Sequence, residues 1–295
     1  MSSARLRRSL VDRMASQWAA LGVGIWGESE RTIVDLEALV SMTAEQGRED
    51  VRLLDAATDW CVRYGRFVHA GRLATVSREI GASPERVGEF AATVAGAGGP
   101  RWPMATSGRS DYVNRQKVLV TDLRRTACLL WRFRAAFGVN ARADVLTVLV
   151  ARPGAALTLA DLARSVRFTK RNVAIAVEAL RLAGLVEATR VGNEDRIRLT
   201  PNSGLRQWLG EIEASAWVDW VTRYRVALRV LHFLDVSAAL EPVVRIVAAR
   251  TLAEELTPEL RRGALPELDI SAIGDAFGRR FDDWVEDLVT EFAEA

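Results

Sequence analysis

The sequence predicts a mainly α-helical protein with one small β element near its centre. Apolar residues recur at helical spacing through residues 1–95 and 205–295, whereas residues 186–199 alternate as two short strands do. The composition, with 49% hydrophobic and 26% charged residues, is that of an ordinary folded chain. At 295 residues the chain is expected to form about two or three domains.

Residues 1–95 are predicted to form a helical domain. Apolar spacing predicts helices over Arg5–Leu21, Ile33–Gln46, Leu53–Tyr64, Leu73–Ile80 and Pro84–Val94. Ser83 fits the cap of the last helix. The last two helices have the spacing of a helix-turn-helix, but Glu85 and Glu89 would then face DNA and repel its phosphates. A structural helical pair is therefore the preferred interpretation.

A linker and a connecting helix are expected next. Residues 96–110 are rich in Gly and Pro, which is typical of a linker. Asp111–Phe137 alternates arginines with apolar residues and predicts one long helix, which Gly138 ends. The connecting segment, residues 111–139, would either pair with its mate in a homodimer or pack on the following domain. The sequence leaves both arrangements open.

Residues 140–204 carry the most distinctive pattern in the chain. Asn140 fits the cap of a first helix, and Thr158 with Asp161 fits a capping box that opens a short second helix. Arg167–Phe168 makes a tight turn, and Thr169 then caps a third helix. Three helices in this order place the third helix at the surface.

Two short strands complete this pattern. Gly184 suits the left-handed end of the third helix, and the strands that follow flank a turn at Gly192–Asn193. Helix, helix-turn-helix and hairpin together predict a winged helix-turn-helix domain, flanked by two helical domains. In such a domain the third helix enters the DNA major groove.

The third helix offers suitable side chains for reading bases. A buried stripe is predicted at Thr169, Val173, Ala176, Val177 and Leu180. The predicted DNA-binding residues of this helix are Thr169, Lys170, Arg171, Asn172 and Ile175. Arg can form two hydrogen bonds with guanine, Asn can form two with adenine, and an aliphatic side chain can contact the thymine methyl group. Glu178 is discordant, unless it accepts from cytosine or pairs with Arg181 or Arg171.

The hairpin is predicted to contact the DNA backbone. Arg190, Asn193, Arg196 and Arg198 are placed to reach phosphate or the minor groove. Glu194 and Asp195 lie at the tip and argue against deep insertion into a groove.

These residues resemble the winged-helix domains of bacterial transcription regulators, particularly the multiple-antibiotic-resistance-regulator (MarR) type. The resemblance rests on the end of the third helix and the wing after it, at Leu180, Ala183, Gly184, Leu185 and Val186. It covers about one fifth of the chain and implies DNA binding. The large helical flanks depart from that family, so its ligand and dimer residues are not carried over.

Residues 205–295 are predicted to form an acidic helical domain. Helices are expected over Leu205–Ile212, Trp217–Leu234, Ala238–Leu256 and Ile270–Phe292, with Thr257-Pro258-Glu259 starting another. This part holds 10 basic and 17 acidic side chains, whereas residues 101–204 hold 18 basic and 8 acidic ones. The basic excess coincides with the predicted winged helix and would attract phosphate. A solvated charged face is the alternative interpretation.

Other functional classes find little support. Cys61 and Cys128 lie in apolar helical patterns, so we expect buried thiols in a reducing compartment rather than a metal site with His69 and His232. No phosphate-binding Gly loop or nucleophile arrangement is apparent, so neither an enzyme nor a cofactor is expected. No apolar run reaches the length of a membrane span, and a cytoplasmic protein is expected.

The preferred hypothesis is a transcription regulator whose partner is double-stranded DNA. The alternative is an antitoxin or adaptor that binds another protein through its acidic C-terminal domain. A fainter likeness supports that alternative, because Leu36–Leu73 resembles bacterial proteins encoded beside nucleotidyltransferase-type toxins. The two hypotheses are compatible, since antitoxins often repress their own operons.

Overall fold

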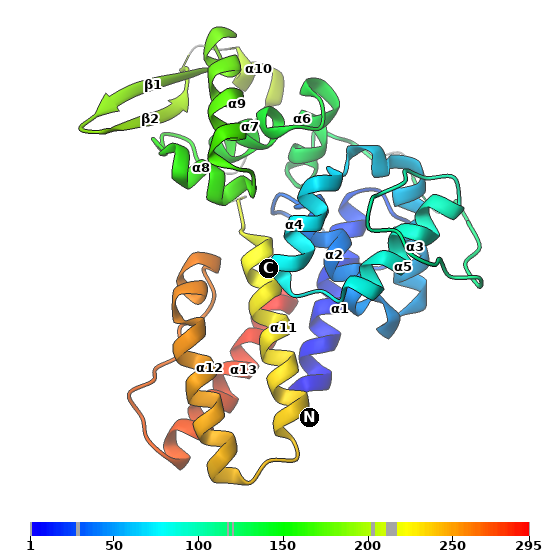
Figure 1. The fold of residues 1–295 in the computed structure, drawn as a ribbon, viewed down its shortest axis with the longest axis vertical. Coiled ribbons are helices and arrows are strands. Elements are labelled where there is room, and N and C mark those ends of the chain that lie inside the picture. Colours follow the sequence, from blue (N-terminus) through cyan, green and yellow to red (C-terminus); the bar gives the residue numbers. More distant parts are fainter. Residues whose placement is uncertain are drawn as a thin grey trace.

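A computed structural model of the chain describes residues 2–27, 30–116, 118–119, 121–201, 204–210 and 217–294. In these residues the protein is mainly helical, with one two-stranded antiparallel sheet (Figure 1). The predicted class, mainly α with a small β element, is confirmed at this level. None of the described helices is both long and apolar enough to cross a lipid bilayer.

The five helices predicted before residue 96 are confirmed, with small shifts at their ends. They are α1 (Ser2–Ala20), α2 (Leu36–Gln46), α3 (Val51–Tyr64), α4 (Ala70–Ile80) and α5 (Pro84–Gly96), with 3-10 turns at Gly47–Glu49 and Gly65–Phe67. Ser83 caps α5 as predicted, by accepting a hydrogen bond from the Arg86 N–H (3.4 Å). The Trp60 ring lies 5.3 Å from that of Trp18 and 5.2 Å from that of Trp131. These rings join α1 and α3 to the middle of the chain.

The long helix predicted over Asp111–Phe137 is wrong for most of its length. Among the described residues of this range, only α6 (Leu129–Phe137) forms an α-helix, after a 3-10 turn at Thr126–Cys128. Residues of the segment 111–125 bind other parts of the chain instead. Asp59 of α3 accepts from the Tyr112 hydroxyl (2.6 Å) and the Arg115 N–H (3.3 Å), and the Leu119 N–H donates to Gly22 O (2.7 Å). The backbone N–H of Arg115, which would bond within a helix, is thus bound by a side chain of another element. Lys117 lies outside the described residues.

Three helices and a hairpin follow in the predicted order. They are α7 (Ala141–Ala151), α8 (Leu159–Val166), α9 (Lys170–Leu182), β1 (Val186–Val191) and β2 (Glu194–Leu199). Asn140, Thr158 and Thr169 cap the three helices, and Thr158 forms the predicted capping box with Asp161. Gly184 has a φ of 71°, the left-handed conformation expected after α9. The strands pair with Val186 opposite Leu199 and Val191 opposite Glu194.

In the described residues 204–210 and 217–294, one short and three long helices follow. They are α10 (Leu205–Leu209), α11 (Trp220–Ser237), α12 (Pro242–Gly263) and α13 (Asp275–Glu294). The helix start predicted at Thr257-Pro258-Glu259 is wrong, because Pro258 lies inside α12. Leu256 and Leu260 are buried on either side of it, so packing carries the helix past the lost hydrogen bond. The predicted end of α10 at Ile212 lies outside the described residues.

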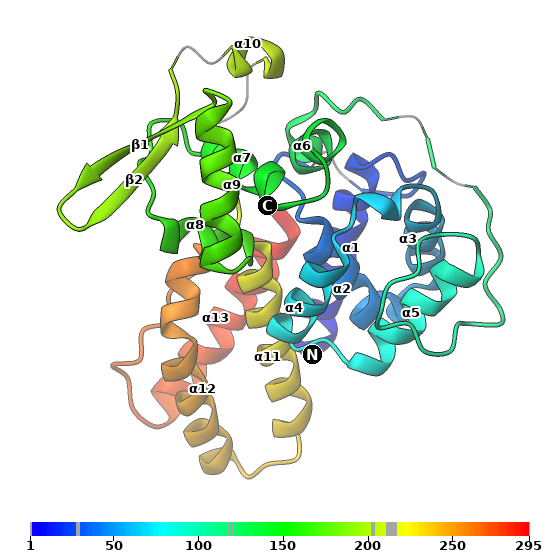
Figure 2. The same cartoon turned by 45° about the horizontal axis from the view of Figure 1, so that its top comes forward.

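Helices from the two ends of the chain share one core. The first helix, α1, packs along α13 and α11 (Figure 1). Arg13 Nε donates to Phe292 O (3.1 Å), and the Tyr224 hydroxyl donates to Gln17 Oε1 (2.7 Å). Figure 2 shows α7–α9 and the sheet at one end of the molecule and the α11–α12 hairpin at the other. The helices α1–α5 and α11–α13 thus form one helical body, and α7–α9 with the hairpin lie at one end of it.

Both cysteines are buried free thiols, as predicted. Burial raises the pKa of the Cys128 thiol to about 12, and it also raises the pKa of Cys61. Neither thiol is therefore ionised near neutral pH.

Candidate nucleic-acid interface

The helix α9 turns one apolar face to the core. Val173, Ala176, Val177 and Leu180 are buried, as the predicted stripe requires. Thr169 was expected in the same stripe but is exposed, because it precedes the helix as its cap. Its Oγ1 accepts a hydrogen bond from the Asn172 N–H (3.2 Å). The core thus fixes which side of α9 faces outward.

The first turn of α9 is open to solvent. Lys170, Arg171 and Asn172 are exposed, and Ile175 is 62% exposed. In the part of the chain that the structure describes, no carboxylate lies within ion-pair distance of Lys170 or Arg171. The five candidate residues of α9 therefore lie together on one accessible surface, and its two cations are available to an anion.

A carboxylate farther along α9 is already paired. Glu178 accepts two hydrogen bonds from Arg181, each 2.9 Å long. The hydrogen bonds from Arg181 lower the pKa of Glu178. This is one of the two pairings considered from the sequence, and it sets the positive charge of Arg181 beside the negative charge of Glu178.

The turn before α9 is fastened to the helical body by Arg167. Its guanidinium is 4% exposed and lies 3.1 Å from Glu79 of α4 and 2.9 Å from Asp219 at the start of α11. It also donates to Thr222 Oγ1 (3.1 Å). Arg167 has a φ of 55°, a conformation that is unfavourable for a residue other than glycine. These contacts offset that cost and fix the direction in which α9 leaves the turn.

Two further contacts hold this turn. Phe168 packs edge-on against the His69 ring, with 5.0 Å between centroids. Arg72 Nε donates to Val166 O at the end of α8 (2.8 Å). Sequence analysis placed Arg167–Phe168 in a turn but did not assign the turn any tertiary partner. These partners lie 52, 88 and 94 residues away along the chain, so no local sequence pattern indicates them.

A buried ionic cluster lies beneath these contacts. It consists of Asp35, Glu37, Arg72, Arg134 and Asp144. Arg72 Nη2 lies 2.5 Å from Asp35 Oδ2, and Arg134 Nη2 lies 2.7 Å from Asp144 Oδ2. Burial alone raises the pKa of Asp35, but the Arg72 guanidinium outweighs it and holds that pKa at about 2. Asp35 therefore stays ionised at neutral pH, and the cluster joins α2, α4, α6 and α7.

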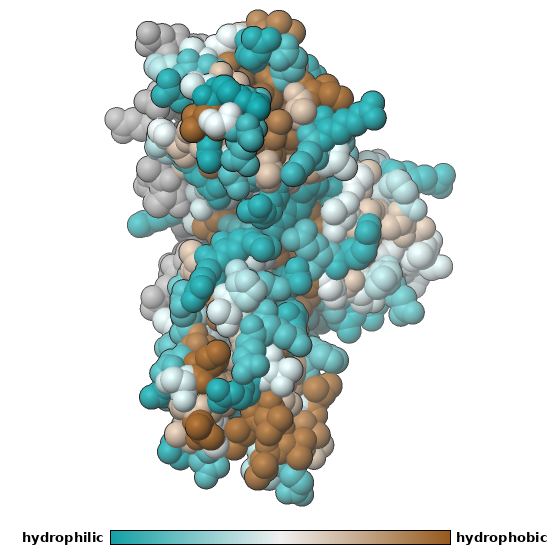
Figure 3. Space-filling view, turned by 60° about the vertical axis from the view of Figure 1, so that its left-hand side comes forward, coloured by the Kyte–Doolittle hydropathy of each residue, from teal (hydrophilic) through white to brown (hydrophobic). Residues whose placement is uncertain are grey.

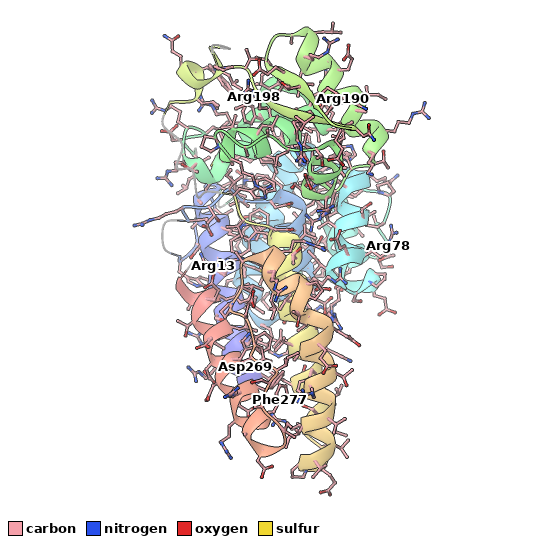
Figure 4. The ribbon with its side chains drawn as sticks, turned by 90° about the vertical axis from the view of Figure 1, so that its left-hand side faces the viewer. Arg13, Arg78, Arg190, Arg198, Asp269 and Phe277 are labelled. Atoms are coloured by element: carbon pink, nitrogen blue, oxygen red, sulfur yellow. The ribbon has the colours of Figure 1, made fainter. Side chains whose placement is uncertain are left out.

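The cations of the hairpin are paired with carboxylates of the same hairpin. Arg190 lies 3.4 Å from Asp195, and Arg196 lies 3.4 Å from Glu194. Arg198 pairs with Glu187 across the strands. Asn193 is exposed at the turn. Figure 4 shows Arg190 and Arg198 on the sheet at the top of the molecule. A phosphate would have to compete with these carboxylates, so the hairpin is a weaker anion site than the first turn of α9.

A cavity of about 340 Å³ opens beside the exposed side of α9. Its lining includes Asn172, Ile175, Phe168, His69, Asn140 and Arg142. Sequence analysis did not single out Arg142, whose exposed side chain follows the Asn140 cap of α7. The predicted cap at Asn140 places Arg142 in the first turn of α7, and this was the signal in the sequence that could have identified it. The cavity is thus lined by residues of both α7 and the exposed side of α9.

Comparison of the chain with models of protein families, with curated proteins and with solved structures finds no match. The functional argument therefore depends on the geometry described above.

Proposed function

We propose that the protein is a DNA-binding transcription regulator that reads double-stranded DNA with α9. The helices α7–α9 and the strands β1 and β2 would act as a winged helix-turn-helix of the MarR-like kind, with the first turn of α9 in the major groove. Phosphate contacts by Lys170 and the hairpin would position this turn, while Arg171, Asn172 and Ile175 would read base edges.

The observation that carries the proposal is the electrostatics around the first turn of α9. Lys170 and Arg171 are exposed and, among the described residues, unpaired with any carboxylate. Two carboxylates that reach the turn before α9, Glu79 and Asp219, are bound by Arg167. The turn therefore presents positive charge that the protein itself does not neutralise, and DNA phosphates are attracted to such a surface.

A binding experiment tests the proposal. Fluorescence anisotropy would measure the affinity of the full chain for duplexes that tile its own promoter region, between 50 and 200 mM salt, where phosphate contacts weaken strongly. The double variant Lys170→Ala with Arg171→Ala is expected to lose specific binding and keep its thermal melt. The matched control is Arg262→Ala with Arg279→Ala, two exposed arginines of the acidic C-terminal part. Equal binding by wild type and the Lys170/Arg171 variant would reject the assignment of α9.

One observation favours a second role in protein binding. Five large apolar side chains are exposed where α11 ends and α12 begins, at Val236, Leu240, Val243, Val244 and Val247. Figure 3 shows apolar surface gathered over that end of the molecule. Exposed apolar surface of this kind marks contacts with other proteins, including a second copy. An adaptor or antitoxin would bind its partner here, and this end lies opposite the sheet (Figure 2).

Light scattering after gel filtration tests this second role. The full chain is expected to self-associate or to bind its genomic neighbour, and Val243→Ser with Val247→Ser should abolish either complex. The control is Leu182→Ser, which alters an apolar side chain that is 76% exposed at the other end of the protein. A monomer that binds no neighbour, with DNA binding intact, would leave only the regulator role.

A further inference from the structure

The helix α4 lies against the turn that precedes α9. Glu79 of α4 accepts hydrogen bonds from Arg167 Nε (3.3 Å) and Nη2 (3.1 Å). The start of α4 is close as well, because the ring of its cap residue His69 packs on Phe168. Both ends of α4 are thus tied to residues 167–168, next to Thr169. The turn that leads into α9 is therefore held directly against α4.

The exposed side of α4 carries small residues and, near its C-terminal end, one arginine. Its exposed residues, Gly71, Ala74, Thr75 and Arg78, follow one another at helical spacing. The first three have small side chains, which leave room for a rod-shaped partner to approach the helix. Figure 4 shows Arg78 on α4 at the right-hand edge of the molecule, below the sheet that carries Arg190. A partner lying along α4 would therefore meet Arg78.

Arg78 is electrostatically available. Over the described ranges of the chain, no carboxylate comes within ion-pair distance of its guanidinium. Its neighbour Glu79 is bound by Arg167, and Glu45, across from the end of α4, is bound by Arg86 (3.0 Å). Arg78, like Lys170 and Arg171, is thus an exposed cation without a carboxylate partner among the described residues, and it lies on the helix that holds the turn before α9.

We propose that a DNA duplex read by α9 also lies across α4, where the Arg78 guanidinium donates a hydrogen bond to a backbone phosphate. This inference rests on the proposed function and extends the interface to the N-terminal helical part. From Gly71 to Arg78 the helix rises roughly 10 Å, the length of about three base pairs. The contact with phosphate falls outside the bases that α9 reads, so it adds affinity without adding sequence preference.

Arg78→Ala tests the inference. The variant should bind about tenfold more weakly, as expected for one lost charge-assisted hydrogen bond, and equally so on specific and unrelated duplexes. The dependence of log affinity on log salt should lose roughly one unit of slope. Arg78→Lys should restore the slope, because a charge remains, and Arg262→Ala should change neither quantity. Hydroxyl-radical footprinting should lose protection at one edge of the site only.

The results separate this inference from the proposed function. If Arg78→Ala binds with wild-type affinity and slope while the Lys170/Arg171 variant does not bind, α4 has no role and α9 still reads DNA. If the Lys170/Arg171 variant binds like wild type, the proposed function fails, and this inference fails with it. Loss of preference for one sequence in Arg78→Ala would also overturn the inference, because a phosphate contact carries no base information.

Discussion

Arg134 and Glu37 form an ion pair that is completely enclosed by the protein. Neither side chain is exposed, and Arg134 Nη1 lies 2.5 Å from Glu37 Oε1. Arg134 also binds Asp144 (2.7 Å) and donates to Phe67 O (2.8 Å). The pair joins residues 97 positions apart, and it holds α6 against α2. Since an unpaired buried charge is strongly destabilising, every member of this cluster depends on the others.

Arg134→Met should lower the free energy of unfolding by roughly 3–5 kcal/mol. The substitution keeps the side chain long and apolar, but it leaves Glu37 and Asp144 buried without their main cation. Urea denaturation followed by circular dichroism measures the change. Arg262→Met, at an exposed position, is the control and should change stability by less than about 0.5 kcal/mol. A loss below about 1 kcal/mol in Arg134→Met would show that the cluster is hydrated and open.

Acid should weaken the fold through the same cluster. The pKa of Asp35 falls from 3.8 to about 2 because Arg72 outweighs burial, and the pKa of Glu37 is lowered from 4.5 by Arg134 and Arg72 against burial. Both carboxyls have a lower pKa folded than unfolded. Their stabilisation is therefore complete above pH 4.5 and is lost as the pH falls toward 2.

Asp35→Asn isolates this contribution. The shift in the pKa of Asp35 alone corresponds to about 2 kcal/mol at neutral pH. Urea denaturation at pH 7, 5, 4 and 3 should show a smaller loss between pH 5 and 3 for the variant than for wild type. Parallel stability curves for the two proteins would contradict the assignment.

Thr169→Ala should destabilise α9 by about 1 kcal/mol. The substitution removes the Oγ1 that accepts from the Asn172 N–H, and Thr169→Ser retains that acceptor. Hydrogen exchange of the amides in the first turn of α9 should accelerate in the alanine variant and not in the serine variant. Unchanged exchange would mean that Arg167 and Phe168 alone hold the turn.

Asn172→Ala should relax base preference more than it lowers affinity for unrelated DNA. A bidentate contact from Asn to adenine is worth about 1–3 kcal/mol of discrimination, whereas a phosphate contact discriminates nothing. Binding to a panel of single-base operator variants measures the effect. If Asn172→Ala weakens all duplexes equally, Asn172 contacts the backbone and base reading lies elsewhere on α9.

Asp195→Asn should tighten DNA binding. The substitution releases Arg190, which Asp195 holds at 3.4 Å, and it removes one negative charge from the hairpin. Salt-dependent anisotropy should show higher affinity and a steeper slope, and Arg190→Ala should lower affinity less than Arg171→Ala does. An unchanged slope in Asp195→Asn would place the hairpin outside the interface.

Local features of the fold were predictable because they depend on neighbouring residues. Asn140, Thr158, Thr169 and Ser83 each bind backbone amides two or three residues ahead, and Gly184 adopts the conformation that only a glycine takes freely. Apolar spacing also placed Val173, Ala176 and Val177 inside and Ile175 outside. Each of these inferences needed no more than one or two helical turns of sequence.

Where a distant contact outweighs local preference, sequence reasoning failed. The arginines and apolar residues after Asp111 suggested a helix, but Asp59 on α3 binds Tyr112 and the Arg115 amide, and that part of the segment is not helical. Pro258 suggested a helix start, but buried leucines on both sides hold α12 continuous.

The sequence by itself determined the order of α7, α8, α9, β1 and β2, the caps at Asn140, Thr158 and Thr169, and the side of α9 that carries Lys170, Arg171 and Asn172. Only the tertiary structure decided that Arg167 fastens this helix to α4 and α11, that the hairpin arginines are already paired, and that no carboxylate among the described residues pairs with Arg78. Charged residues look alike along a sequence. Whether a charge is buried, neutralised or free for a phosphate depends on partners that folding brings from distant parts of the chain.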